Sequence, residues 1–334
     1  MKLKIIFLVV ICFLNGYSQN QKYIVKDSLT NEVIEFVGIN FLNNVGVYTG
    51  SNGEFYADPS RTPKIIISHL SYEEKIVQLY KSDNIIYLTP KVINLNEIVI
   101  ENKKLKKQFI DINTSNKNTK NFSGFGTYGY QLAVLIKPID TLKNYYLDQI
   151  SLPINVDKLW MSINNMKEVP NALVRINFSI NSNNKPSDSL FNYLEYILLN
   201  KKTYKEGFVY HKMKTRISVP KEGLFCILTL LGETDLKGNL IVEKPTYKSY
   251  NLGKEIIFFK YLPIQIPLQK ENEEQNSFSR SYFNKEDNAY GNVTPLIAVP
   301  SSLTSKERAS YIREKSEELG RFSVPIKYTL YYYD

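Results

Sequence analysis

The stretch Thr49-Gly50-Ser51-Asn52-Gly53-Glu54-Phe55 (TGSNGEF) decides how the first part of this chain folds. It lies between two runs of alternating apolar residues and concentrates glycine and asparagine, which accept positive φ angles at little steric cost. The pattern predicts a hairpin turn in which Gly53 has positive φ and Phe55 returns to a sheet core. It does not indicate a loop that grips a ligand.

Strand-like runs separated by turn signals continue on both sides of this stretch, as expected of a small antiparallel sandwich. The expected strands are Tyr23 to Lys26, Val37 to Leu42, Val47 to Thr49, Glu54 to Ala57, Lys64 to Ser68, Lys75 to Leu79, Ile85 to Leu88 and Glu97 to Ile100. We predict one β-domain over residues 19–101.

The order of residues in this region is similar to that of a known family. The shared positions are Val25-x-Asp27, Thr30, Phe36-Val37-x-Ile39, Thr49-x-x-x-Gly53-x-Phe55, Ile65-x-Ile67-Ser68, Tyr72, Leu88 and Leu95-Asn96-Glu97-Ile98-Val99-Ile100. Residues 22–101 thus resemble the carboxypeptidase-regulatory-like domain found in exported proteins of Bacteroidota, although Tyr23 and Ser71 replace glycines of the family. The resemblance implies a seven-stranded transthyretin-like β-sandwich without peptidase activity, in which Gly53, Phe55 and Tyr72 serve the turn and the core.

The N-terminus has the layout of a secretory signal peptide over residues 1–18. Two lysines precede an apolar run from Ile5 to Leu14, which is short for a membrane anchor, and small and polar residues follow. We therefore predict export to the periplasm, the outer membrane or the cell surface. Cys12 follows Ile11 rather than a small residue, which argues against lipid attachment. Cys226 is the other cysteine, so we expect no internal disulfide.

Composition favours strands and argues against nucleic acid as a partner. The chain has 25 tyrosines and 17 phenylalanines, residues typical of half-buried strands, so the expected class is mostly β. The net charge of +9 falls to +7 when the leader lysines Lys2 and Lys4 are removed. The remaining basic residues are dispersed except in one segment, and an exported protein does not meet nucleic acid.

That basic segment, residues 102–122, is rich in lysine and asparagine and has few apolar anchors, which predicts a linker. Residues 123–334 are expected to form a second domain, a larger jelly-roll-like β-sandwich with one or two short helices. Its expected strands are Tyr128 to Ile136, Leu147 to Pro153, Ala172 to Ile180, Phe208 to Val219, Leu224 to Leu231, Glu255 to Tyr261 and Phe322 to Tyr333.

Three patterns in this second part make finer predictions. ALVRINFSIN (172–181) alternates, which predicts a half-buried strand with Arg175 and its neighbours on a solvated face. LFCILTLLG (224–232) is apolar on both faces, as in a strand covered on each side. SLFNYLEYILLN (189–200) has helical spacing, although its tail also fits a strand, and residues 305–319 have the capping signals of a helix that ends before Gly320.

No catalytic or cofactor motif is evident. A zinc site needs several imidazoles at fixed spacing, whereas this chain has only His69, expected at a strand end, and His211, expected near the core with a hydrogen-bond partner. We expect Cys226 to be a buried, unreactive thiol. The letters Gly124-x-Gly126-x-x-Gly129 precede a strand rather than a helix, so they do not predict a nucleotide site. Residues 284–288 lack the spacing of a calcium loop. We expect no cofactor and no metal.

Two alternatives remain open at this stage. Asp148, Glu195, Glu233 and Asp235 could supply the two acids of a carboxylate-dependent, glycosidase-like hydrolase, although surface charges are the simpler interpretation. A small outer-membrane β-barrel fits the length, but the double-sided apolar runs do not suit it.

The favoured prediction is an exported, non-enzymatic protein of the cell envelope. It would act as a structural or binding module whose partner is an unidentified envelope protein or polysaccharide. Trp160, the single tryptophan, is the one candidate binding residue, in a stretch expected to be a loop.

Overall fold

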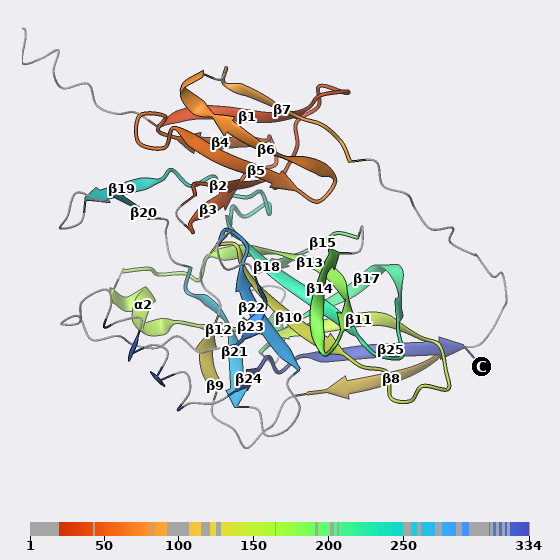
Figure 1. The fold of residues 1–334 in the computed structure, drawn as a ribbon. Coiled ribbons are helices and arrows are strands. Elements are labelled where there is room, and N and C mark those ends of the chain that lie inside the picture. The colour runs from red at the N-terminus through yellow and green to blue at the C-terminus, as the bar shows by residue number, and fades with distance from the viewer. Residues whose placement is uncertain are drawn as a thin grey trace, which may run out of the picture.

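A computed structural model describes most of the chain (Figure 1). The described residues are 20–42, 44–81, 83–91, 107–114, 121–124, 128–163, 165–190, 193–200, 204–205, 207–249, 255–258, 262–270, 276–284, 289–293, 321–333 and six positions between 307 and 318. The expected signal peptide and the expected strand Glu97 to Ile100 lie outside them. The chain is mostly β, as predicted.

Residues 20–91 form two small sheets, which we call the N-terminal sandwich. Strands β4 (Glu54–Ala57), β1 (Gln21–Asp27) and β7 (Ile85–Leu88) pair in that order, and the other sheet has the order β3 (Gly46–Tyr48), β2 (Gly38–Asn40), β5 (Lys64–His69), β6 (Tyr72–Gln78). A short 3₁₀ helix, η1 (Leu79–Lys81), leads from one sheet to the other. Fully buried side chains, among them Tyr23, Phe55 and Ile67, fill the space between the sheets.

The TGSNGEF turn differs from the predicted hairpin. Gly53 does have positive φ, 70°, and Phe55 is fully buried, but β3 pairs with β2 while β4 pairs with β1. The turn therefore carries the chain from one sheet of the sandwich to the other. The expected all-antiparallel arrangement is also wrong at one place, because β1 and β7 run parallel.

The rest of the chain forms longer sheets below the N-terminal sandwich in the view of Figure 1. The largest has the order β14 (Lys185–Leu190), β13 (Asn171–Ser182), β18 (Leu224–Thr234), β10 (Tyr130–Ile136), β22 (Ser277–Ser281), β23 (Gly291–Asn292), and β15 (Glu195–Leu199) also pairs with β13. The second has the order β16 (Tyr204–Lys205), β17 (Phe208–Val219), β11 (Tyr145–Pro153), β25 (Lys327–Tyr333), β8 (Lys107–Asn113).

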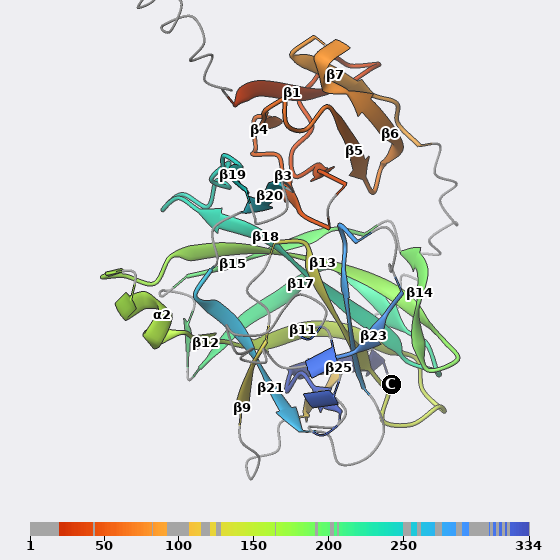
Figure 2. The same ribbon diagram turned by 60° about the vertical axis from the view of Figure 1, so that its left-hand side comes forward.

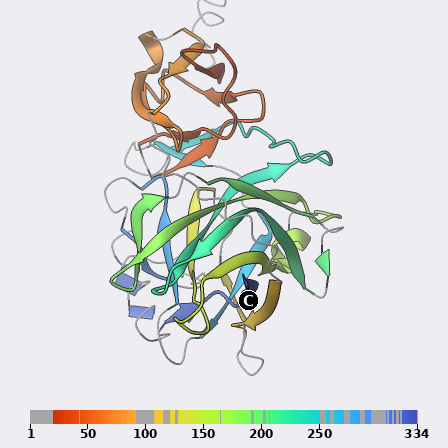
Figure 3. The same cartoon turned by 90° about the vertical axis from the view of Figure 1, so that its right-hand side faces the viewer.

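Two smaller sheets complete this C-terminal part (residues 107–333). In one, β21 (Ile264–Lys270) pairs with β12 (Asn155–Val156), β24 (Phe322–Ser323) and β9 (Asn121–Gly124). In the other, β19 (Thr246–Ser249) and β20 (Glu255–Phe258) form a two-stranded ribbon. This ribbon lies beneath the N-terminal sandwich in Figure 2, and Figure 3 shows the long strands of the larger sheets from the side.

The segment expected to be a linker, residues 102–122, contains strand β8. Its sequence KQFIDIN alternates, so Ile110 and Ile112 turn toward the core while Phe109 and Asp111 are exposed. Pairing along all of β25 supplies the burial that composition alone did not suggest. The expectation of an unstructured linker is therefore wrong for Lys107–Asn113.

The predicted solvated face of β13 is also wrong. Arg175, Asn177 and Ser179 are buried, because other segments cover this face. Asn177 donates to the Tyr193 carbonyl at 3.1 Å, Ser179 donates to the Ser187 carbonyl at 2.7 Å, and Arg175 lies against tyrosines at the N-terminal sandwich. For β18 the prediction is confirmed, since LFCILTLLG is buried on both faces.

The helix predictions had mixed outcomes. The helix expected in residues 189–200 is wrong, because β14 and β15 occupy the described part of this segment and the strand alternative holds. The described positions between 307 and 318 are helical, as predicted. A short helix, α2 (Lys158–Ile163), occupies the stretch expected to be a loop around Trp160. Within the described ranges no helix is both long enough and apolar enough to cross a bilayer.

Candidate functional site

Phe283 joins the two parts of the chain. Its side chain is 1% exposed and belongs to a cluster of buried apolar residues drawn from both parts: Phe36, Tyr48, Leu173, Leu231, Leu240 and Phe283. A Cβ at Gly46 or at Gly129 would overlap the Phe283 ring, so glycine at both positions lets the backbone approach it. The two parts therefore pack as closely here as elements within one core.

Hydrogen bonds fix the orientation of this joint. Asn40 donates to the Phe283 carbonyl at 2.8 Å in a buried position, and the hydroxyls of Ser68 and Tyr282 are 3.0 Å apart. On the β19–β20 side, the Tyr247 hydroxyl accepts the Asp58 N–H at 3.1 Å. Hydrogen bonds are directional, so these contacts favour one arrangement of the two parts.

Arg175, on β13, is a buried cation at the joint. It is 5% exposed, and its guanidinium lies 5.3 Å from the Tyr48 ring centre and 5.7 Å from that of Tyr282. Among the described residues no carboxylate pairs with it, so the faces of these rings provide its electrostatic compensation. Sequence alternation placed Arg175 in solvent and gave no sign of this role.

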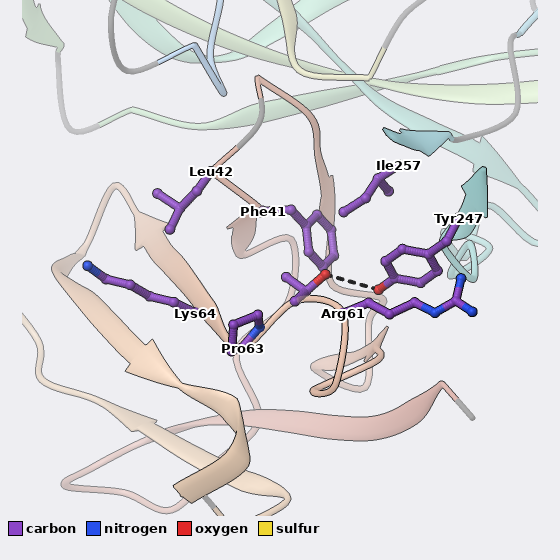
Figure 4. A pocket seen from close by; sticks show the side chains of 8 residues that line it. Phe41, Leu42, Arg61, Pro63, Lys64, Tyr247 and Ile257 are labelled. Atoms are coloured by element: carbon purple, nitrogen blue, oxygen red, sulfur yellow. Dashed lines mark hydrogen bonds between the residues drawn. The ribbon is translucent and has the colours of Figure 1, made fainter. Parts of the chain in front are cut away.

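A pocket of about 280 Å³ opens beside the joint (Figure 4). Its walls come from the N-terminal sandwich and from the β19–β20 ribbon: Phe41, Leu42, Arg61, Thr62, Pro63, Lys64, Tyr247 and Ile257. The Thr62 and Tyr247 hydroxyls are 3.1 Å apart, and the Arg61 guanidinium lies 5.3 Å from the Tyr247 ring centre and 3.5 Å from an Asp58 oxygen. Thr62 and Arg61 thus each already contact Tyr247.

A second surface lies on the outer side of the sheet β16-β17-β11-β25-β8. Alternation along these strands turns Ile110, Leu147 and Leu330 toward the core, and the intervening residues face outward. The outward residues next to one end of β25 are aromatic or basic. We call this set the aromatic–basic face: Lys107, Phe109, Tyr146, Arg216, Tyr331 and Tyr333.

Strand register places three of these rings in one row. Phe109 is opposite Tyr331, and Tyr331 is opposite Tyr146. The ring centres are 6.0 Å apart in the first pair and 5.4 Å apart in the second, while Tyr333 meets Tyr331 edge-on at 5.7 Å. Phe109 is 55% exposed, whereas burial, followed by neighbouring Tyr333, raises the pKa of Tyr331 to about 12. Tyr331, in the middle of the row, is therefore uncharged at neutral pH, and Phe109 is the exposed end of the row.

Two cations lie over this row. The Arg216 guanidinium is 3.7 Å from the Tyr146 ring centre and 5.1 Å from that of Tyr333. The Lys107 ammonium is 4.3 Å from the Tyr331 ring centre. No carboxylate of the described residues lies within ion-pair distance of either cation. The cations are therefore held by the rings rather than by neighbouring acids.

His211 lies where the sequence predicted, on the inward face of β17 with a buried partner. Its Nε2 contacts an Oε2 carboxylate oxygen of Glu195, and the other oxygen accepts the Lys214 N–H at 2.7 Å. Glu195 is 2% exposed and stands on β15, so the pair ties β15 to β17. The His211 ring and the Lys214 N–H group compensate the Glu195 carboxylate for the water that it loses on burial.

His69 ends β5, as predicted, and is a neutral base. Its Nδ1 accepts the Ser71 N–H at 3.2 Å and its ring meets Tyr72 edge-on. Burial, followed by the positive charges of Arg175 and Lys91, lowers the pKa of His69 to about 4. Tyr72 donates to Asp27 at 2.8 Å, which fits the structural role expected of it.

Cys226 is buried, and burial raises the pKa of its thiol far above the ordinary range.

Glu195 and Glu233 are too far apart to act together as a catalytic pair. Glu195 is opposite Ile176 and Glu233 is opposite Ala172, on different sides of β13, so they are roughly 13 Å apart along the strand direction alone. Glycosidase carboxylates stand about 5 to 9.5 Å apart. Asp235 accepts N–H groups from Lys237 and Asn239 within its own turn, and Asp148 marks the bulge in β11.

The other sequence candidates lie partly outside the described residues. Trp160 lies in α2, but its side chain is outside the described residues, as are residues 285–288 of the loop considered for calcium. Gly129, the last glycine of the nucleotide-like pattern, precedes strand β10. Among the described residues no three His, Cys, Asp or Glu side chains gather as metal ligands.

Comparison with known proteins does not assign the chain to a class. No protein-family model, no curated protein and no solved structure matches it. The resemblance of residues 22–101 to the carboxypeptidase-regulatory-like domain therefore stays a prediction.

Proposed function

We propose that this chain is an exported, non-enzymatic binding module of the bacterial cell envelope, and that its aromatic–basic face binds a glycan. The N-terminal sandwich would be the regulatory-like domain that the sequence resembles, acting as a structural support. Catalysis is not part of the proposal, because Glu195 and Glu233 lie far apart along β13, and Glu195 and Asp235 each accept hydrogen bonds from nearby N–H groups.

The row Phe109, Tyr331 and Tyr146 is the observation that carries this proposal. Its ring centres are 6.0 and 5.4 Å apart, and the row crosses neighbouring strands of one sheet. Phe109 is 55% exposed, whereas Tyr331 is 5% exposed and has Lys107 over its ring. Aromatic side chains with polar tips suit ligands that have both apolar and hydroxylated surfaces, and sugars have both. A site on strands is also held in place before the ligand arrives, which reduces the entropy lost on binding.

The joint supports the proposal in a different way. Phe283, Asn40 and Tyr282 attach the N-terminal sandwich to the C-terminal part through apolar packing and hydrogen bonds. Such an attachment suits an envelope protein that must present one binding face in a defined orientation.

Affinity electrophoresis in native gels that contain single polysaccharides tests the proposal. The purified chain without its leader should migrate more slowly in at least one gel of a panel of neutral and acidic polymers. Phe109→Ala removes the most exposed ring of the row and should restore most of the mobility, because Phe109 is 55% exposed and its loss leaves no core cavity.

Tyr80→Ala is the matched control, since Tyr80 is 57% exposed and lies in η1, on the N-terminal sandwich. It should migrate like the unchanged protein in every gel. Retardation by no polysaccharide, or equal retardation of Phe109→Ala and the unchanged protein, would contradict the proposal.

A further inference from the structure

We infer that the ligand of the aromatic–basic face is an acidic polysaccharide, one that carries carboxylates on its sugar rings. This inference rests on the proposed function, because it names the ligand class of the same face. Its evidence is separate: it comes from the cations over the rings and not from the rings alone.

Arg216 is arranged to receive a carboxylate. Its guanidinium is stacked 3.7 Å from the centre of the Tyr146 ring, and stacking occupies a flat face of the guanidinium while its N–H donors point outward from the edge. Those donors match the two oxygens of a carboxylate. The stack also fixes the long side chain in advance, so less conformational entropy is lost when an anion binds.

Lys107 supplies a second positive charge, over the middle ring of the row. Its ammonium lies 4.3 Å from the Tyr331 ring centre, while Arg216 lies over Tyr146, so the two cations are associated with successive rings. A polymer that extends along the row would thus place charges on successive sugars near successive cations.

The outward side of this sheet carries more basic than acidic residues. The basic residues that face outward on β8, β17 and β25 are Lys107, Lys212, Lys214, Arg216 and Lys327, against the acids Asp111 and Asp148. Asp111 already accepts a hydrogen bond from Thr329 at 2.6 Å. A positive field of this kind attracts a polyanion and repels a polycation, and salt screens it.

The pocket beside the joint is a poorer site for such a polymer. It also contains basic residues, Arg61 and Lys64, but Arg61 is paired with Asp58 and lies against Tyr247. At about 280 Å³ the pocket would hold a single small group rather than a chain of sugars. It nevertheless provides a control cation, since Lys64 is exposed and distant from the aromatic–basic face in sequence and sheet.

Binding to three polymers of similar length tests the inference: polygalacturonate, the same polymer after reduction of its carboxyl groups, and polyglutamate. The dissociation constant is measured by biolayer interferometry at low and at moderate salt. The full chain without its leader should bind polygalacturonate at least tenfold more tightly than either other polymer. The affinity should fall as salt rises, because exposed charges are screened.

Two charge variants locate this preference. Arg216→Gln combined with Lys107→Gln should weaken polygalacturonate binding at least tenfold, so that the variant no longer prefers this polymer to the reduced one; a retained preference would overturn the inference. Lys64→Gln, the matched control, should change neither. Far-UV circular dichroism and the unfolding midpoint of each variant check that the fold is kept.

The outcomes separate the inference from the proposed function. Equal binding of the reduced and unreduced polymers would overturn the acidic ligand while leaving a glycan-binding face. Equal binding of polyglutamate and polygalacturonate would show that charge suffices without sugar rings, and it would also overturn the inference. A loss of polygalacturonate binding seen only in Lys64→Gln would overturn it too. Binding to none of the three polymers would overturn this inference, and failure of the wider polysaccharide panel would remove the proposed function as well.

Discussion

Phe283→Ala should uncouple the N-terminal sandwich from the C-terminal part. The ring is 1% exposed and fills the space left by Gly46 and Gly129, so its removal leaves a cavity that the rigid sheets cannot close. Replacing a buried phenylalanine by alanine costs about 3–5 kcal/mol in free energy of unfolding. Because Phe283 packs with Phe36 and Tyr48 of the other part, a large share of this cost should fall on the joint.

Urea unfolding followed by two probes measures the uncoupling. Fluorescence of Trp160, the single tryptophan, reports on the C-terminal part, and far-UV circular dichroism reports on both parts. The two transitions should coincide in the unchanged protein and separate in Phe283→Ala. Phe278→Ala is the control: Phe278 is 2% exposed but lies in β22 against Phe225, so this variant should lose similar stability and keep coincident transitions. Coincident transitions in Phe283→Ala, or separate ones in Phe278→Ala, would refute the coupling.

Three further predictions concern single residues. Gly53→Val should lower the free energy of unfolding by about 1–3 kcal/mol or more, because valine disfavours positive φ and its Cβ would lie 2.7 Å from the Val25 carbonyl oxygen. Gly291→Val is the control: a Cβ at Gly291 meets nothing within 4 Å, so this variant should change the free energy of unfolding little in the same denaturation assay. Burial and the charge of Arg175 lower the pKa of His69 to about 4, so the neutral ring's contribution to the free energy of unfolding is fully present above pH 6.5 and is lost progressively as the pH falls toward 4. Arg175→Met should raise this pKa in an NMR titration of the ring protons, and an unchanged value would exclude the charge effect. Cys226 should react with a thiol reagent only as fast as the chain unfolds, because it is buried and burial raises its pKa; rapid labelling of the native protein would contradict that placement.

Local patterns predicted the strands better than they predicted how the strands pair. The stretch around Gly53 contains the information for a positive φ and for a buried Phe55, and both are present. The partner of each flanking strand depends on the whole sandwich, so the same turn could close a hairpin or cross between sheets. A local sequence does not distinguish these cases.

Burial by distant segments explains the two largest differences. Alternation in β13 correctly separated two faces, but it did not show that Tyr48 and Tyr282 would cover Arg175. In β8 the basic composition of the segment concealed the alternation of polar and apolar residues. Ile110 and Ile112 become core residues only because β25 pairs beside them. Both cases require contacts between residues far apart in the chain.

The candidate site was hidden from the sequence for the same reason. Phe109, Tyr146 and Tyr331 come from three separate segments and meet only through strand register. The one available signal was the abundance of tyrosine and phenylalanine, which indicates strands and not a location. Trp160, the binding residue that the sequence suggested, lies in α2, and its role stays a prediction.

Hydrogen exchange measured by mass spectrometry with and without polygalacturonate tests the central claim most directly. If the aromatic–basic face binds the polymer, peptides that cover β8, β11, β25 and the end of β17 near Arg216 should exchange more slowly in its presence. Peptides from the N-terminal sandwich and from the β19–β20 ribbon should be unchanged. Protection confined to the pocket or to the joint, or no protection anywhere at a saturating polymer concentration, would contradict the claim.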